Sequence, residues 1–223
     1  MIVISPAKRL AERVSENSLK LTTPYFKKEA DQLAKELALM SPQELGSMMH
    51  VSEGIAQLNS TRYKNWNKGT GSEKRAIFQF EGDVFKHLNV GQFNDQQINY
   101  MNENLRILSG IYGLLRPSDE MSPYRLEMGT KHSFNGFKNL YEFWGDKIAK
   151  KINEELESIR GAVYSSNQNY QFSKADFDAV KYQLEDARFK KQNTEKLEKQ
   201  LKQLDNKTKK AFIISESYQL KVD

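Results

Sequence analysis

The stretch LRILSGIYGLLRPSDEMSPYRLEMG, residues 105–129, combines three glycines, two prolines and two tyrosines with a continuous apolar run. Just before and inside it, apolar residues recur at intervals of three, four and three: Ile98, Met101, Leu105 and Leu108. This spacing predicts an amphipathic helix over residues 95–108, with Gly110 as its C-terminal stop. We call this segment rich in glycine and proline, residues 105–129, the corner of the chain. It either binds a ligand or forms a turn that the fold requires.

Two interpretations of the corner remain open. In a helix-hairpin-helix element, a glycine turn between two helices points backbone N–H groups at DNA phosphates, and the missing Cβ allows close approach. Residues 95–116 are similar to such an element, with Gly110 and Gly113 in the turn. However, the usual glycine spacing is two residues, and Pro117 stops a second helix after one turn. The alternative is a purely structural turn.

Three cations are predicted to lie near this corner. Lys8, Arg116 and Arg125 each stand in a loop beside a proline or glycine, so each could hold a phosphate oxygen. Arg116 as a loop residue should be replaceable by alanine without loss of stability. Glu127 lies two residues after Arg125, so a structural Arg–Glu pair is an equally good interpretation. Lys8 has the alternative of a solvated loop lysine.

Aromatic residues near the corner could stack on nucleic acid bases. Tyr112, Tyr124 and Trp144 are the candidates. Their spacing among leucines favours the core for Trp144, and the same alternative stands for both tyrosines.

The remaining pattern up to residue 157 predicts a mixed set of elements. MIVIS, residues 1–5, is a predicted buried strand that ends at Pro6, and Ser41 followed by Pro42 is typical of a helix start. Further predicted elements are helices over 24–39, 52–63 and 139–156 and a strand over 76–80. We therefore expect one mixed α/β (α+β) domain over residues 1–223, with a mixed sheet flanked by helices.

The character of the sequence changes after Ser158. GAVYSSNQNY, residues 161–170, predicts a strand and a turn, and AFIIS, residues 211–215, predicts a last strand. Between them, leucines and charged residues predict a long, largely solvated helix over 177–204. We expect this helix to pack poorly, so that proteases cut first between Lys190 and Lys210.

Composition limits the classes of function. The chain has no cysteine, which excludes disulfides, thiolate nucleophiles and zinc–thiolate sites and suits a cytoplasmic location. Its first residues have too short an apolar run for a signal peptide or a membrane span. With 34 basic and 29 acidic residues the net charge is +5, which is compatible with a polyanionic partner. A monomer is compatible with the sequence.

No pattern in the sequence requires an enzyme. There is no Walker loop, no Rossmann glycine pattern and no nucleophile elbow. His50, His87 and His132 are far apart and do not have the spacing of metal ligands. We therefore expect no catalytic residues, no cofactor and no metal site.

The ordered motifs ISPAK, FEGDVF, LRILSGIYGLLRPSDEMSPYRLEMG and LYEFWGDKI resemble the YaaA family of peroxide-stress proteins, also called UPF0246. The resemblance covers residues 1 to about 156. It implies a single-domain mixed fold that binds DNA and protects bacteria from hydrogen peroxide and iron-driven damage.

The rest of the chain departs from the family pattern. The family continues with Asn-Leu-Ala-Ser-x-Glu-Tyr, Lys-x-Ala-Arg-Gly and Gly-Phe-Asn-x-x-Gly-Tyr segments. Here only YSSNQNY, residues 164–170, and FIISESY, residues 212–218, are faintly similar to the first two segments, and the third is missing. We expect residues 158–223 to be a divergent or truncated part.

These observations predict a DNA-binding protein of the peroxide response that contacts the phosphate backbone in a basic cleft and reads little sequence. Its partner would be duplex or branched DNA. The expected phosphate-binding residues are Lys8, Gly110, Gly113, Arg116, Tyr124 and Arg125. One alternative is an enzyme for a small phosphorylated or nucleotide substrate, with Lys8 and Arg125 as anchors and Glu127 as acid or base. Another is an inactive family member.

Overall fold

The computed structural model describes residues 1–11, 20–67, 74–189 and 195–219. The chain forms two compact units, Met1–Ala149 and Lys150–Asp223. All described strands and most of the buried residues belong to the first unit. No described helix is both long enough and apolar enough to cross a bilayer.

The first unit is built on a three-stranded mixed sheet. β1 (Ile2–Ile4) pairs in parallel with β5 (Leu105–Ser109), and β5 pairs antiparallel with β6 (Gly113–Leu115). The mixed α/β class expected from the sequence is therefore confirmed. β1 is a strand as predicted, but it is an edge strand, so Ile2 is 58% exposed rather than buried.

The prediction that the helix reaches residue 108 is wrong. α6 (Asp95–Asn104) begins at an Asn94 cap and ends where Leu105 becomes extended, and the next five residues form β5. A central strand that is buried on both faces typically has a nearly continuous apolar run. Such a run also contains apolar residues at helical spacing, so this spacing does not distinguish a helix from a buried strand. Gly110 therefore lies in the β5–β6 connection and Gly113 begins β6, so neither lies between two helices.

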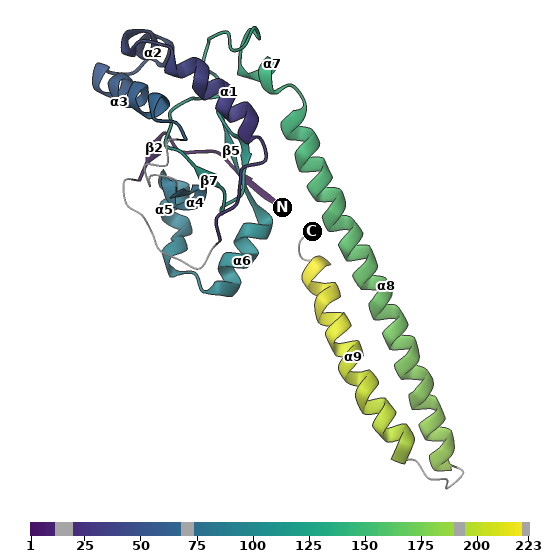
Figure 1. Ribbon diagram of the computed structural model, residues 1–223. Helices are drawn as coiled ribbons and strands as arrows, with labels where there is room; N and C mark the ends of the chain where they lie inside the picture. The colour runs from purple at the N-terminus through teal and green to yellow at the C-terminus, as the bar shows by residue number, and fades with distance from the viewer. Residues whose placement is uncertain (12–19, 68–73, 190–194, 220–223) are drawn as a thin grey trace. The chain divides into compact units, whose positions relative to one another are not determined.

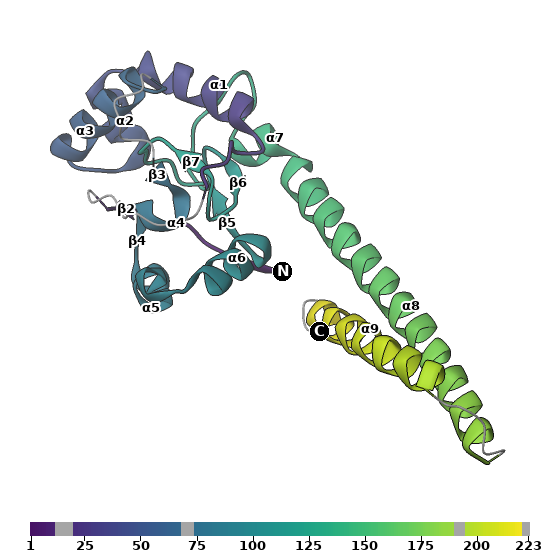
Figure 2. The ribbon, with the colours of Figure 1, turned by 60° about the horizontal axis from the view of Figure 1, so that its bottom comes forward.

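Helices cover both sides of the strands (Figures 1 and 2). On one side lie α1 (Lys27–Ala38), α2 (Pro42–Met49) and α3 (Glu53–Lys64), and on the other side α5 (Asp83–Leu88), a 3₁₀ turn (Val90–Gln92) and α6. The predicted start of α2 is confirmed: Ser41 accepts a hydrogen bond from the Glu44 amide, and the Glu44 carboxylate accepts one from the Ser41 amide.

Two short antiparallel pairs complete the strands. β2 (Arg9–Leu10) pairs with β4 (Phe80–Glu81), and β3 (Lys74–Arg75) pairs with β7 (Glu120–Met121). The strand predicted over 76–80 is wrong, because residues Ala76–Gln79 form one helical turn, α4. The amides of Ala76 and Ile77 donate to carbonyls of Asp119 and Pro117, which satisfies them without a strand ladder.

The core gathers around Trp144, which ends α7 (Leu140–Trp144) and is 2% exposed. Its ring packs edge-on against Phe26 and Phe143, and its indole N–H donates to the Gly110 carbonyl at 3.0 Å. The expected core position of Trp144 is confirmed. The helix predicted over 139–156 is interrupted, because Gly145 adopts a φ of +49° and ends α7.

α8 (Lys147–Phe189) begins in the last residues of the first unit. Its part from Lys150 onward and α9 (Glu195–Gln219) form the second unit. The strands predicted over 161–170 and 211–215 are wrong, since both segments are helical. In α8 the buried residues Val163, Ser166 and Ser173 recur at helical spacing, and Thr208 of α9 donates to the Ser173 carbonyl at 2.9 Å. This pairing of helices overrides the local preference of valine and tyrosine for strands.

Limited proteolysis of the folded protein should cut in the second unit before the first. Only Val163, Ser166 and Ser173 are buried among the side chains described there, so local opening of its helices costs little free energy. The expected window of 190–210 begins at residues 190–194, which lie outside the described ones, and continues into α9. Mass spectrometry of the first fragments is the measurement. A first cut within residues 20–67 would contradict the expectation.

Candidate nucleic-acid interface

The loop after β1 places a lysine at the surface of the first unit. Ser5, Pro6 and Ala7 lead from β1 to Lys8, directly before β2. The Lys8 ammonium lies 3.0 Å from a carboxylate oxygen of Glu127, and the two side chains are 65% and 45% exposed. Lys8 is thus solvated and paired, in agreement with its predicted loop position.

Three buried tyrosines fix the segment that contains Arg125. Tyr63 donates to the Arg125 carbonyl at 2.6 Å, and the Ser122 amide donates to the Tyr112 hydroxyl at 2.9 Å. The Tyr124 hydroxyl lies 2.7 Å from the Ser109 hydroxyl of β5. Burial raises the pKa of all three phenols, so they remain protonated at neutral pH. Tyr124 is therefore a core residue, and its ring is not available for stacking on a base.

Arg125 itself is only partly paired. Its terminal nitrogen Nη2 lies 3.3 Å from Glu127, while its buried Nε has no hydrogen-bond partner among the described residues. The Glu127 carboxylate therefore lies between two cations, Lys8 and Arg125. A buried donor without an acceptor is costly, so this position of the Arg125 side chain is held by its surroundings at some cost in free energy.

A groove of about 670 Å³ opens beside these cations. Its basic residues come from the loop after β1, from β2, from α3 and from the segment after β7, and Glu81 is the single carboxylate among its described lining residues. They are Lys8, Arg9, Arg62 and Arg125. Arg9 lies 3.5 Å from Glu81 with its side chain 76% exposed. The four cations give the groove a local positive charge that attracts polyanions.

A second cavity of about 470 Å³ adjoins Lys8 and Arg125. Lys8 and Arg125 line both cavities, and Glu127 lines only the second. Most of the remaining lining residues are apolar or glycine. They comprise Ser5, Pro6, Ala7, Leu108, Ser109, Gly110, Tyr124, Leu126, Met128, Gly129 and Tyr141.

The two glycines of the predicted turn are required by packing. A Cβ on Gly110 would lie 2.3 Å from the Leu126 carbonyl oxygen, so the β5–β6 connection could not approach that segment. Gly113 has a φ of +68°, and a Cβ there would lie 2.8 Å from the Trp144 ring. The turn thus serves the core, and phosphate binding by its amides stays a prediction.

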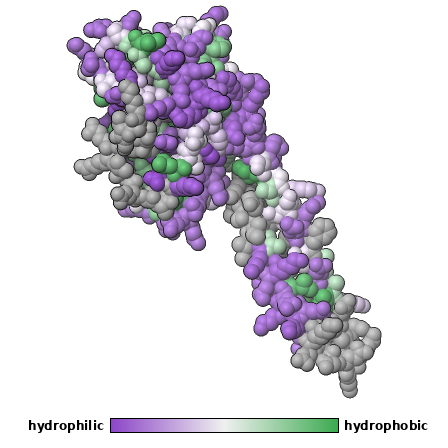
Figure 3. Space-filling model, viewed as in Figure 1, coloured by the Kyte–Doolittle hydropathy of each residue, from purple (hydrophilic) through white to green (hydrophobic). Residues whose placement is uncertain are grey.

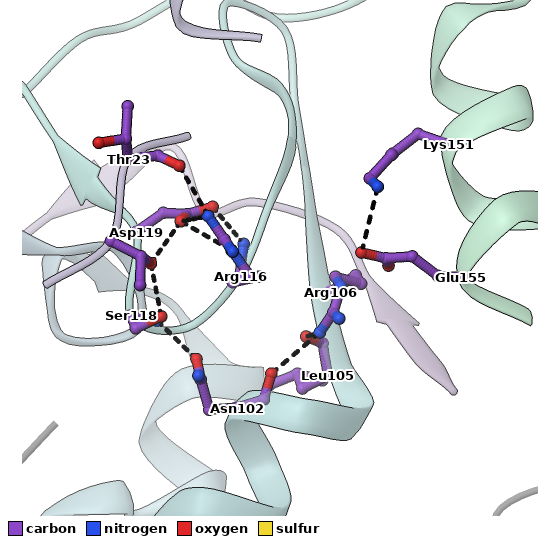
Figure 4. Close-up of polar contacts among 10 residues, drawn as sticks. Thr23, Asn102, Leu105, Arg106, Arg116, Ser118, Asp119, Lys151 and Glu155 are labelled. Carbon is purple, nitrogen blue, oxygen red and sulfur yellow. Dashed lines mark hydrogen bonds and ion pairs between the residues drawn. The ribbon is translucent and has the colours of Figure 1, made fainter. Parts of the chain in front are cut away.

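Arg116 lies in a separate polar network (Figure 4). Its guanidinium contacts the fully buried Asp119 carboxylate at 2.8 Å, donates to the Thr23 carbonyl at 2.7 Å, and lies 4.3 Å above the Tyr25 ring. It lines neither the groove nor the second cavity. Although a loop residue, Arg116 thus has a structural task, which changes the expectation that alanine is tolerated there.

Sequence reasoning missed Arg9 and Arg62 as members of the groove. Arg9 follows Lys8 directly, and two adjacent cations at the end of a strand loop were a usable signal. Arg62 had no such signal, because its position depends on which face of α3 meets the loop after β1.

The face shown in Figure 3 is mostly hydrophilic, with hydrophobic residues in small separate patches.

Comparison with known proteins gives consistent results. A sequence model of the family described as "Peroxide stress protein YaaA" matches residues 1–211. A UPF0246 protein of Clostridium botulinum (strain Alaska E43 / Type E3) is 42% identical over 175 residues, which cover 78% of this chain and 68% of the relative. A UPF0246 protein of Neisseria meningitidis serogroup A is 44% identical over 156 residues, covering 69% and 60%.

Proposed function

Since this chain belongs to the YaaA family of peroxide stress proteins, we propose that it acts in the peroxide response by binding DNA in the groove lined by Lys8, Arg9, Arg62 and Arg125. The observation that supports this proposal is the convergence of four cations from four chain segments on one groove, whose described lining holds a single carboxylate. Binding takes place in the cytoplasm, where bacterial DNA lies.

Backbone phosphates are the groups that this groove suits. Arginine guanidinium groups bind two phosphate oxygens at once, and Lys8 acts as a mobile point charge. Phosphate contacts of this kind position a protein on DNA but do not identify its sequence. The proposed binding is therefore of low sequence specificity and depends strongly on salt.

Phosphate binding also links the groove to peroxide. Ferrous iron on DNA converts hydrogen peroxide to hydroxyl radicals, so damage arises where iron is bound. Protein cations that neutralise phosphates release the metal ions condensed there. A protein bound through this groove would thus displace iron from the sites where radicals do most harm.

The test is a binding titration with a labelled duplex and a branched junction at several salt concentrations. Log affinity should fall linearly with log salt for both DNAs, with similar slopes. An affinity that does not change between low and physiological salt would refute the phosphate mechanism.

Glu127→Gln is expected to increase DNA affinity severalfold. The Glu127 carboxylate pairs with Lys8 and Arg125 and competes with phosphate for both cations. Because these are partly exposed pairs worth up to about 1 kcal/mol, their loss should leave the melting temperature nearly unchanged.

Glu53→Gln is the matched control for this prediction, since Glu53 is exposed, lines neither cavity and carries the same charge. It should change affinity much less than Glu127→Gln. Weaker DNA binding by Glu127→Gln would argue against a competing carboxylate.

A second candidate function is an enzyme for a small phosphorylated substrate. It is favoured by one observation: Lys8, Arg125 and Glu127 line the second cavity together, as that hypothesis required. Under this function a free nucleoside monophosphate binds without DNA, and Lys8→Ala abolishes that binding.

A further inference from the structure

The groove and the second cavity differ in chemistry but share two residues. The groove is lined by four cations, whereas the second cavity has mainly apolar walls. Lys8 and Arg125 line both of them. A phosphate held by this pair of cations would therefore lie at the boundary between a polyanion-binding surface and an apolar pocket.

We propose that the second cavity is a pocket for a single unpaired nucleotide of the bound DNA. The phosphate of this nucleotide binds Lys8 and Arg125, and its base enters the cavity. The inference rests on the proposed function, because the neighbouring phosphates of the same strand follow the groove.

The walls of the cavity suit the flat faces of a base. Leu108, Leu126 and Met128 give apolar surface, and Tyr141, which is 65% exposed, adds an accessible aromatic ring. An exposed aromatic ring is the group on which unpaired bases commonly stack. The exposed Ser5 adds a hydroxyl to the lining, which can hydrogen-bond to a base edge.

The size of the cavity suits one nucleotide. Its volume of about 470 Å³ is within the range of about 300–1,000 Å³ typical of small-ligand pockets. A base pair in a duplex cannot enter, so the base must leave the stack. Unstacking costs least where the base is already mismatched, damaged or unpaired. The pocket should therefore favour DNA that contains such a nucleotide.

The charge arrangement at the boundary supports a phosphate at this position. Lys8 and Arg125 already hold the Glu127 carboxylate between them, at 3.0 and 3.3 Å. The proposed phosphate would displace this carboxylate and bind in its place between the two cations.

Gly129 allows a test that fills the pocket and spares the groove. It lines the second cavity but not the groove, and a Cβ on it meets no atom within 4 Å. Gly129→Phe should therefore fold normally and occupy the pocket with a ring. Gly91→Phe is the matched control, because Gly91 also has open space and lines neither cavity. Thermal melting checks that both variants are folded.

The experiment measures the affinity for three DNAs: a matched duplex, the same duplex with one bulged nucleotide, and one with a bulged abasic residue. The natural protein and Gly91→Phe should bind the bulged nucleotide severalfold more tightly than the other two DNAs. Gly129→Phe should lose this preference and keep its affinity for the matched duplex. The abasic DNA separates recognition of a base from recognition of a flexible backbone.

Four other outcomes are informative. Equal affinity of the natural protein for all three DNAs, or equal affinity for the two bulged DNAs, would overturn the nucleotide pocket and leave the DNA groove standing. No binding to any DNA would overturn the proposed function itself. Tighter binding of free deoxynucleoside monophosphate than of bulged DNA, lost in Gly129→Phe, would assign the pocket to free nucleotides and overturn its link to DNA.

Discussion

Gly110→Ala is expected to destabilise the first unit by about 3 kcal/mol or more, at or above the upper end of ordinary overpacking. The added Cβ would lie 2.3 Å from the Leu126 carbonyl oxygen and 3.1 Å from the Leu126 carbonyl carbon. Both are backbone atoms, so no side-chain rotation relieves the clash. The Gly110 carbonyl also accepts the Trp144 indole N–H, so its displacement would disturb the centre of the core.

Chemical denaturation followed by Trp fluorescence measures this effect. Gly129→Ala is the control, because it adds the same methyl group at another glycine, where no atom lies within 4 Å. It should be close to neutral. A Gly110→Ala protein as stable as Gly129→Ala would show that the hairpin does not approach Leu126 as closely as described.

Arg116→Ala is expected to cost about 3 kcal/mol at neutral pH, the lower end for breaking a buried ion pair, because Arg116 keeps some exposure. The Asp119 carboxylate is fully buried and would lose its cation, keeping the Thr22 hydroxyl and the residue 116 amide as donors. The cation–π contact with Tyr25 and the bond to the Thr23 carbonyl are lost as well.

The cost of Arg116→Ala should decrease in acid. Burial raises the pKa of Asp119 above its ordinary 3.8, although Thr22 and Arg116 oppose this shift. A raised folded-state pKa means that stability falls as the pH increases from the unfolded value through the folded one. Loss of Arg116 raises this pKa further, so the variant loses more stability than the natural protein between about pH 4 and pH 7.

Denaturation curves at these two pH values test the prediction, with Asp119→Asn as the comparison. In the Asp119→Asn protein this buried side chain carries no charge at any pH. In acid the Asp119 carboxyl of the Arg116→Ala protein becomes protonated and loses its charge as well. The difference in free energy of unfolding between the two variants should therefore be smaller in acid than at neutral pH. An Arg116→Ala penalty that is small at pH 7, or that is equal at both pH values, would contradict the described pair.

Local signals in the sequence were sufficient for several parts of the structure. The capping of α2 at Ser41 depends on residues three apart, and the first strand ends at Ile4, two residues before Pro6. The proximity of Lys8 and Arg125 was also anticipated from their loop positions beside proline or glycine, and the hypothesis of a pocket added Glu127. In each case the information lies in neighbouring residues or in the loop character of the single positions.

The rest depended on contacts between distant segments. Leu105–Ser109 is a strand because it pairs with β1 on one side and β6 on the other, which no local spacing reveals. Residues 161–170 are helical because α8 pairs with α9, more than thirty residues further along the chain. The structural task of Arg116 follows from a partner, Thr23, ninety-three residues away. Arg62 joins the groove only when α3 is placed against the loop after β1.

The claim that DNA binds in the basic groove is tested most directly by the salt dependence of an Arg9→Gln/Arg62→Gln double variant. Lys28→Gln/Lys86→Gln removes the same charge from residues that line neither cavity. We predict that the groove variant weakens binding to all duplex sequences alike and reduces the salt slope by about one for each lost phosphate contact, whereas the control keeps nearly the natural slope. A folded groove variant with the affinity and slope of the natural protein would contradict the account.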